Sequence, residues 1–336
     1  MKRKKNLLEK IVDLDNLYTA YWKARKGKEA KHEVQKYASN VDANILALQQ
    51  QLLNGNVAVG NYRYFTIFDP KQRLICAAPF EQRVLHHALM NVCGPLLDSR
   101  QIYDSYASQV GKGTYAALQR AMQLHKRHKW CLKIDIRKYF DSINHDVLKH
   151  QLSAFFKEEL LLKIFFDIID SYDSGDSHRG LPIGNLTSQY FANHYLSGVD
   201  HFAYEQAKVK GYVRYMDDIL VYDDDRDGLL RKSKEIRQMI ECRMNLSLKV
   251  FDLRPTSVPT QFLGYRISQS CVQLSQRSMK RFRHKMEQYY DRYQKTEWTE
   301  KDYQRHLSPL LAFVLKANSF NFRKRVLEST CNRGAS

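Results

Sequence analysis

The segment that most constrains the fold is Tyr215-Met-Asp-Asp, where two adjacent carboxylates stand between two β-prone runs. Gly211-Tyr-Val-Arg precedes it and Ile219-Leu-Val-Tyr follows it, so the pattern predicts a β-hairpin with the acidic pair at its tip. Asp is common in turns because its side chain satisfies nearby backbone groups. Turn chemistry explains one Asp, which leaves two interpretations of the pair open: a simple turn or a functional site.

A second acidic residue lies in a strongly apolar run. Trp130 to Ile136 reads Trp-Cys-Leu-Lys-Ile-Asp-Ile, which is typical of a buried strand. An ionised Asp135 in such a strand is costly unless it is paired or binds a metal. If this strand neighbours the hairpin, Asp135, Asp217 and Asp218 meet and can hold two divalent cations. Hard carboxylate oxygens favour Mg²⁺.

The charge balance indicates the kind of partner. The 336 residues include 54 Lys and Arg against 36 Asp and Glu, a formal net charge of +18. Such an excess favours a polyanion, most often nucleic acid, because neutralised phosphates release their counterions. We find neither a membrane-spanning apolar run nor a signal-peptide core, which predicts a cytoplasmic protein. The six cysteines form no CxxC pair, which argues against a zinc site or a disulfide framework.

The first half of the chain predicts helices and one hairpin. Apolar positions recur at helical spacing within residues 1–60, and Gly55 is a plausible helix stop. Tyr62 to Phe68 and Arg73 to Cys76 alternate as strands around turn residues, which places Lys71 and Arg73 near a hairpin tip. These two cations can bind a triphosphate or simply guard a solvated edge. A helix from Phe80 carries Arg83, a further candidate for phosphate contact.

The second half adds turns, helices and short strands. Gly180-Leu-Pro-Ile-Gly suggests backbone brought close to a ligand ahead of a helix that runs to about Glu205. From Arg277 the pattern indicates a small basic helical bundle in which Lys280 and Arg281 suit a nucleic-acid backbone. Other expected elements are helices over about 115–128, 146–156 and 229–243, and short β segments over 245–249 and 261–267.

Five spaced motifs together resemble those of reverse transcriptases, over roughly residues 60 to 270. In order along the chain they are Asp135 with Phe140, Gly180-Leu-Pro-Ile-Gly with Ser188, Tyr215-Met-Asp-Asp, Lys249 after Leu-Ser-Leu, and Phe262-Leu-Gly-Tyr. The resemblance implies an α+β right-hand polymerase with fingers, an RRM-like palm carrying an antiparallel sheet, and a helical thumb. The expected organisation is a helical extension over 1–60, fingers and palm over 61–265, and the thumb over 266–336.

The same resemblance implies roles for individual residues. Asp135 and Asp217, helped by the backbone of Ile136 and with Asp218 close by, would hold two Mg²⁺ ions. Lys249 would protonate the departing pyrophosphate, and Phe140 would act as a steric gate against a ribose 2′-hydroxyl. The nucleotide is expected to contact Lys71, Arg73, Ile136, Phe140, Ile183 and Gly184. Nucleic acid is expected to contact Arg83, Gln189, Tyr215, Met216, Gly264, Lys280 and Arg281.

The residue before the second glycine of Gly180-Leu-Pro-Ile-Gly indicates which subtype of reverse transcriptase to expect. Most bacterial and retroviral reverse transcriptases have Gln there, whereas this chain has Ile183. Ile183-Gly-Asn-Leu-Thr-Ser-Gln and Pro79-Phe-Glu-Gln-Arg-Val look like the enzymes of diversity-generating retroelements, within the group II intron-like bacterial lineage. That resemblance implies error-prone copying of a template RNA at adenines, mutagenic retrohoming into a target gene, and a basic helical pentameric accessory protein as partner. Ile183 can instead serve core packing.

Two alternatives to this function remain open. A reverse transcriptase of the antiphage-defence or retron type would share the metal site. A catalytically silent RNA-binding scaffold would share the basic surface, although the intact Asp135, Asp217 and Asp218 argue against it. The resemblance to the bacterial enzymes implies a cytoplasmic protein encoded by a bacterium or its phage.

Overall fold

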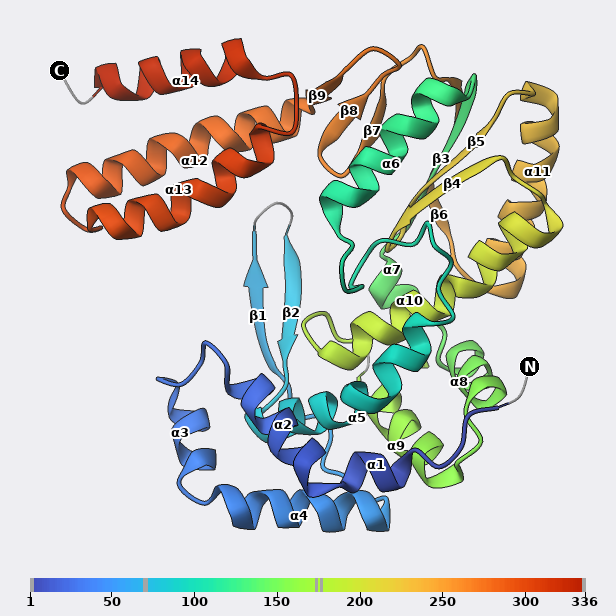
Figure 1. Ribbon diagram of the computed structural model, residues 1–336, viewed down its shortest axis with the longest axis vertical. Helices are drawn as coiled ribbons and strands as arrows, with labels where there is room; N and C mark the ends of the chain where they lie inside the picture. Colours follow the sequence, from blue (N-terminus) through green and yellow to red (C-terminus); the bar gives the residue numbers. More distant parts are fainter. Residues whose placement is uncertain (1–2, 69–71, 173–174, 176–177, 334–336) are drawn as a thin grey trace. The chain divides into compact units, whose positions relative to one another are not determined.

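The computed structural model describes residues 3–68, 72–172, 175 and 178–333 (Figure 1). Its chain forms two compact units, each built from three segments. Unit 1 comprises residues 1–103, 136–208 and 234–249, and unit 2 comprises residues 104–135, 209–233 and 250–336. Each unit is described here by itself.

Unit 2 is organised around a four-stranded sheet with the strand order β4-β5-β3-β6 (Figure 1). Its strands are β3 (Trp130–Ile136), β4 (Gly211–Tyr215), β5 (Asp218–Asp223) and β6 (Leu248–Pro255). β5 pairs antiparallel with both β3 and β4. The apolar run of β3 is buried at Cys131, Leu132, Ile134 and Ile136, as its sequence predicted for a central strand.

Helix α6 (Thr114–Arg127) covers one face of this sheet. Its buried residues, among them Leu118 and Leu124, pack with Val213, Leu220 and Tyr222 from the strands. The helix is amphipathic, and the cations Lys126 and Arg127 in its last turn complement the carbonyl end of its dipole. Removing this apolar surface from water is the main force that holds helix and sheet together.

The C-terminal part of unit 2 combines a small sheet with a helical bundle. β7 (Thr260–Phe262), β8 (Tyr265–Ile267) and β9 (Val272–Leu274) form an antiparallel sheet. The helices are α12 (Gln276–Gln294), α13 (Glu300–Val314) and α14 (Phe320–Arg333). Phe282 and Met286, which lie on one face of α12, share a core with Val314 and Val326 of the other two helices.

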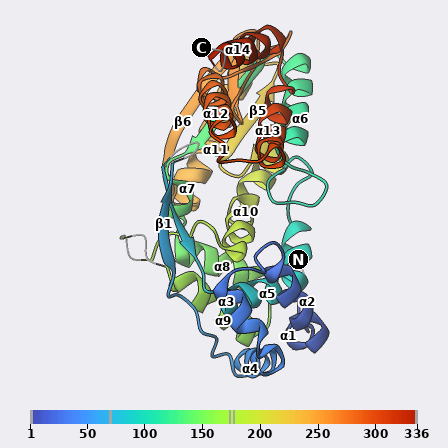
Figure 2. The same cartoon turned by 90° about the vertical axis from the view of Figure 1, so that its left-hand side faces the viewer.

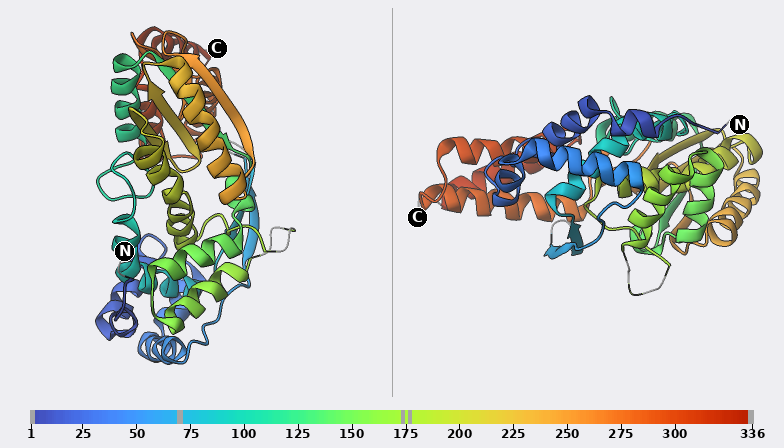
Figure 3. Two further views of the ribbon diagram at one scale, coloured as in Figure 1. Left: turned by 90° about the vertical axis from the view of Figure 1, so that its right-hand side faces the viewer. Right: turned by 90° about the horizontal axis from the view of Figure 1, so that it is seen from below.

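Unit 1 consists of helices and one hairpin. Its helices are α1 (Leu8–Val12), α2 (Leu14–Arg25), α3 (His32–Ala38), α4 (Val41–Asn54), α5 (Phe80–Asp98), α7 (Tyr139–Ser142), α8 (His145–Phe155), α9 (Glu159–Asp170) and α10 (Leu186–His201). Figure 3 shows α8 and α9, in green, lying side by side. α5 is central, because it packs against α2 on one side and α10 on the other.

The hairpin of unit 1 pairs β1 (Arg63–Ile67) with β2 (Arg73–Ala77), and Figure 2 shows this ribbon rising from the helices of its unit. Its base is buried through Tyr62, Cys76, Ala78 and Tyr172. Beyond the base, both faces are exposed, including the rings of Tyr64 and Phe65. The tip around Lys71 lies outside the described residues, so its expected triphosphate contact stays a prediction.

Most expected elements are present, and several differ in extent. Within described residues 3–60 the helical spacing corresponds to α1, α2, α3 and α4, and α4 ends at Gly55, whose φ of 65° gives the left-handed cap that glycine favours. The segment 261–267 is two strands, β7 and β8, and not one. α10 ends at His201 and a π-helical turn continues to Gln206. α11 (Arg226–Gln238) begins earlier than predicted, and a second π-helical turn reaches Arg243. No described helix has the length and apolarity that a bilayer crossing requires.

Candidate active site

Three carboxylates come together at one end of the main sheet of unit 2. The register places Asp135 directly opposite Asp218, and Asp218 is also paired with Tyr215 across the hairpin. Met216 and Asp217 form the turn between them. The side chains of Asp135, Asp217 and Asp218 are each half-buried. The predicted meeting of the two acidic strand ends is therefore present in the structure.

The electrostatics of Asp218 reflect this crowding. Burial, with a smaller contribution from the neighbouring charges of Asp135 and Asp217, raises the pKa of Asp218 to about 6, although Lys133 opposes the rise. The Nζ of Lys133 lies 3.3 Å from Oδ1 of Asp218. Like charges held together in a partly desolvated place are unfavourable unless a cation neutralises them. The three carboxylates therefore favour binding of a cation at this site.

Lys133 was not among the residues that the sequence predicted for this site. It lies two residues before Asp135 in β3, so both side chains project from the same face of the sheet. Its ammonium also donates a hydrogen bond to the carbonyl oxygen of Gln261. The signal was available, because a lysine at an alternate position of an apolar strand needs a nearby carboxylate.

The donor set at this site suits Mg²⁺. Three carboxylates supply hard oxygen ligands, and their mutual repulsion shows that a divalent cation would be stabilising there. Among the described residues, the side chains of His, Cys, Asp and Glu nowhere converge in a ready-made group of three around a metal position. Magnesium binding by Asp135, the backbone of Ile136, Asp217 and Asp218 therefore stays a prediction that the ligand chemistry supports.

The residues expected at the nucleotide's sugar and base lie in unit 1. Phe140 belongs to the short helix α7, and its carbonyl oxygen accepts a hydrogen bond of 2.8 Å from the backbone N–H of Leu181. The carbonyl of Ile183 accepts one of 2.8 Å from the N–H of Cys76 in β2. These two bonds join α7, the Gly180-Leu-Pro-Ile-Gly turn and the base of the hairpin. Arg73 begins β2 and is exposed.

Gly184 shows why this turn requires glycine. Its φ is +122°, and a Cβ at this position would lie 3.1 Å from Cγ2 of Ile75 and 3.2 Å from the carbonyl oxygen of Cys76. The backbones of the turn and of β2 therefore approach each other as closely as they can. A side chain here would force them apart and would strain φ.

We expect Gly184→Ala to lower the free energy of unfolding by about 1–3 kcal/mol. The added Cβ would strain the positive φ and would also be too close to β2. Gly27→Ala is the matched control: Gly27 also has a positive φ, +71°, but has no atom within 4 Å of the added Cβ. Urea unfolding followed by circular dichroism measures both variants. Equal losses for the two substitutions would contradict the close approach of the turn to β2.

Arg83 and Gln189, two predicted nucleic-acid contacts, line one cavity of unit 1 together with Lys28, His86, His87, Gly184, Asn185 and Leu186. The guanidinium of Arg83 donates to the carbonyl of Ala78 and forms a 3.0 Å ion pair with Glu33. Burial and the charge of Arg83 lower the pKa of Lys28. Positive charge therefore accumulates at this cavity, which is compatible with the predicted phosphate contact. His86 is buried with no hydrogen-bond partner for either ring nitrogen among the described residues, so it acts as a packing residue.

The remaining predicted contacts lie in unit 2, except Lys249, which is exposed in β6 at the end of the third segment of unit 1. Tyr215 ends β4, and its hydroxyl accepts a hydrogen bond from Thr114 Oγ1. Gly264 lies in the turn between β7 and β8, where its carbonyl accepts bonds from Ser275 N and Ser278 Oγ. Lys280 is exposed on α12, and the guanidinium of Arg281 lies 5.6 Å from the ring centre of Phe313.

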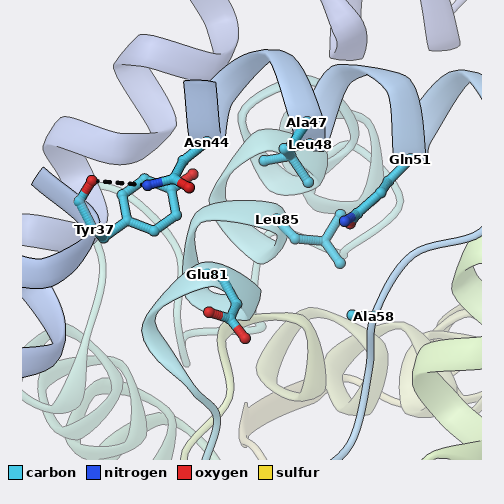
Figure 4. A pocket seen from close by; sticks show the side chains of 8 residues that line it. All are labelled: Tyr37, Asn44, Ala47, Leu48, Gln51, Ala58, Glu81 and Leu85. Carbon is cyan, nitrogen blue, oxygen red and sulfur yellow. Dashed lines mark hydrogen bonds between the residues drawn. The ribbon is translucent and has the colours of Figure 1, made fainter. Parts of the chain in front are cut away.

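A further cavity of unit 1 contains none of the predicted site residues. Figure 4 shows it between α3, α4 and the start of α5, lined by Tyr37, Asn44, Ala47, Leu48, Gln51, Ala58, Glu81 and Leu85. The Nδ2 of Asn44 donates to the carbonyl oxygen of Tyr37 at its rim. Its mixed apolar and polar lining identifies no particular ligand.

Comparison with known proteins decides the family. A family model described as reverse transcriptase (RNA-dependent DNA polymerase) matches residues 68–267, which is more than half of the chain and includes all three carboxylates. The chain belongs to the reverse transcriptase family. This confirms the family resemblance, and the α+β architecture confirms the predicted right-hand polymerase class.

Two similar proteins are named as intron proteins. The chain is 21% identical over 335 residues to the "Putative COX1/OXI3 intron 1 protein" of Saccharomyces cerevisiae, covering 78% of this chain and 39% of that protein. It is 27% identical over 150 residues to the "Uncharacterized 91 kDa protein in cob intron" of Schizosaccharomyces pombe, covering 43% of this chain and 17% of that protein. The chain thus spans well under half the length of either relative.

A solved structure supports the fold. Apo telomerase from Candida tropicalis superposes with a TM-score of 0.51 at 13% identity, covering 88% of this chain and 68% of that chain. At this identity the likeness concerns the fold alone. This chain therefore shares its fold with the telomerase structure, and the likeness says nothing about a telomeric role.

Proposed function

We propose that this reverse transcriptase is an RNA-directed DNA polymerase that extends a primer on an RNA template. The observation that carries the proposal is the register that sets Asp135 opposite Asp218, with Asp217 in the adjoining turn, inside a domain of the reverse transcriptase family. The basic composition supports nucleic acid as the substrate.

The residues of the chain supply positioning and electrostatics for nucleotidyl transfer. Bound Mg²⁺ ions would stabilise charge on the phosphates and favour ionisation of the primer 3′-hydroxyl. Asp135, Asp217 and Asp218 would hold these ions, and Lys133 forms an ion pair with Asp218 beside them. Arg73, and Lys71 by prediction, would bind the triphosphate, while Phe140 would exclude a 2′-hydroxyl. Lys249 would donate a proton to pyrophosphate.

Primer extension tests the activity directly. The full chain is incubated with an RNA template, a DNA primer, dNTPs and Mg²⁺, and the products are resolved by length. The proposal expects template-directed extension, and a protein that binds the duplex without extending it would support the silent scaffold instead.

We further propose the diversity-generating subtype, with error-prone copying at template adenines, retrohoming into a target gene and a basic pentameric accessory protein as partner, in the cytoplasm of a bacterial or phage-infected cell. Ile183 supports it: a Gln at this position can hydrogen-bond near the incoming nucleotide, whereas Ile cannot, so mispairs are penalised less. Ile183 is half-buried, with its backbone fixed to Cys76. The two intron-encoded relatives favour a second candidate, an intron-type enzyme.

We expect Ile183→Gln to lower misincorporation opposite template adenine by about 10-fold, since a polar contact then penalises mispairs. Sequencing of the cDNA made on a mixed template gives the error at each template base. Ile183→Leu, which keeps the apolar side chain and its volume, should retain the adenine errors. Equal error rates opposite all four bases in the wild type would contradict the diversity-generating subtype and favour the retron, defence or intron types.

A further inference from the structure

Arg214 is a fully buried cation beside the catalytic turn. It lies in β4, one residue before Tyr215, and it is the largest fully buried side chain among the described residues. Its Nη1 donates a 3.3 Å hydrogen bond to the carbonyl oxygen of Met216. Burial of a guanidinium is unfavourable unless its hydrogen-bonding geometry is satisfied, so this side chain needs a reason to lie inside the sheet.

Met216 is the residue that this bond restrains. Its φ is +53°, which is uncommon for a side chain other than Asn, Asp or Gly. The first position of a two-residue hairpin turn with positive φ is normally taken by Gly, Asn or Asp. Because Met216 is followed directly by Asp217, the backbone of Met216 sets the direction in which the catalytic pair projects.

The backbone of Arg214 is itself fixed from the outer edge of the sheet. Its N–H donates to the carbonyl of Asp104, and its carbonyl accepts from the N–H of Tyr106, each at 2.9 Å. The carboxylate of Asp104 is held by two bonds from Arg120, of 2.9 and 3.1 Å, and one from the Tyr106 hydroxyl. These hydrogen bonds restrain the backbone of Arg214 and so limit the movement of its guanidinium.

We propose that Arg214 is a positioning residue, which holds the Met216 carbonyl so that the turn keeps its left-handed backbone and presents Asp217 and Asp218 correctly. This inference rests on the proposed polymerase function. Arg214 touches neither substrate nor metal in this role, because it acts through the backbone of Met216. The sequence carried a signal for it, an arginine within the buried run Tyr-Val-Arg-Tyr, that the prediction passed over.

The test combines Arg214 with the turn that it restrains. Arg214→Met removes the hydrogen bond at similar volume, and Met216→Gly removes the backbone strain that the bond offsets. We expect Arg214→Met to lower kcat for primer extension about 100-fold with little change in KM for dNTP, because misplaced catalytic groups cost about this much. In the Met216→Gly background the same substitution should cost about 10-fold or less.

Two readouts separate positioning from a purely structural role. Hydrogen exchange of the amides in 215–219 should speed up in Arg214→Met and return towards the Met216→Gly level in the double variant. Mn²⁺ affinity, measured by electron paramagnetic resonance, should weaken in Arg214→Met. Arg214→Lys keeps the positive charge but lacks the planar guanidinium. Its kcat should therefore lie between that of the wild type and that of Arg214→Met.

The outcomes distinguish the two proposals. An inactive wild type would overturn the polymerase function, whereas an active wild type with unchanged kcat and exchange rates in Arg214→Met would overturn the role of Arg214 alone. If Arg214→Met fails to fold, Arg214→Lys with and without Met216→Gly supplies the comparison. Equal fractional losses in both backgrounds would mean that Arg214 does not act through the Met216 turn.

Discussion

Asp217→Asn is expected to lower primer extension by at least about 10³-fold, with the protein still folded. The substitution keeps the size of the side chain and removes one of the negative charges that, in the proposed function, would attract the divalent cations, and electrostatic groups of this kind contribute factors of about 10²–10³ each. Loss of a proposed metal ligand would add to that effect. Because Asp217 lies in the turn and raises the pKa of Asp218, its neutralisation should also make the remaining cluster less repulsive.

Asp227→Asn is the matched control for this experiment. Asp227 is also in unit 2, in α11, but it is exposed and forms an ion pair of 3.2 Å with the adjacent Arg226. It should extend primers at the wild-type rate. Gel-resolved extension at saturating dNTP, with thermal melting of each variant, gives the comparison. Equal activity of the Asp217→Asn variant and the wild type would overturn the catalytic assignment of the acidic turn.

The parts of the site that sequence could predict are those with strict local patterns. The alternation around Tyr215-Met-Asp-Asp and the apolar run up to Ile136 give both acidic strands, and the turn then sets the register of β4 with β5. The pairing of β3 with β5, which brings Asp135 opposite Asp218, is visible only in the structure. A continuous apolar strand has to lie in the sheet interior, where a carboxylate is costly unless it is paired or binds a metal. A functional role for Asp135 could therefore be predicted before its neighbours were known.

The parts that sequence missed depend on weak or very short signals. β9 spans three residues, Val272–Leu274, too few for alternation to show, and α3 begins after Lys31 without a side-chain cap. Helix α9 had a clear amphipathic pattern in Glu-Leu-Leu-Leu-Lys-Ile-Phe-Phe that was passed over. The ion pair of Lys133 with Asp218 forms only when β3 pairs with β5, so the sequence alone does not show it.

Phe140→Ala is expected to weaken the preference for dNTPs over rNTPs by about 10- to 100-fold, through a gain in kcat/KM for rNTPs. The side chain of Phe140 is half-buried, and its position is well determined by its surroundings. Its backbone is bonded to Leu181, and its ring meets that of Tyr139 edge-on at 5.8 Å between centres. An aromatic ring held in this way can exclude a ribose 2′-hydroxyl by contact, and Ala cannot.

Tyr139→Phe separates this gate from a general disturbance of α7. Tyr139 is buried, and its hydroxyl donates to the carbonyl of Ala192 in α10, so its loss should lower stability without altering the choice of sugar. Single-nucleotide incorporation with dNTP and rNTP gives the ratio of kcat/KM for each variant. A ratio that shifts equally in Phe140→Ala and Tyr139→Phe would mean that selectivity depends on the integrity of the helix and not on the ring. If only Phe140→Ala shifts it, the ring itself selects the sugar, because both variants disturb the same four-residue helix but only one removes the aromatic surface.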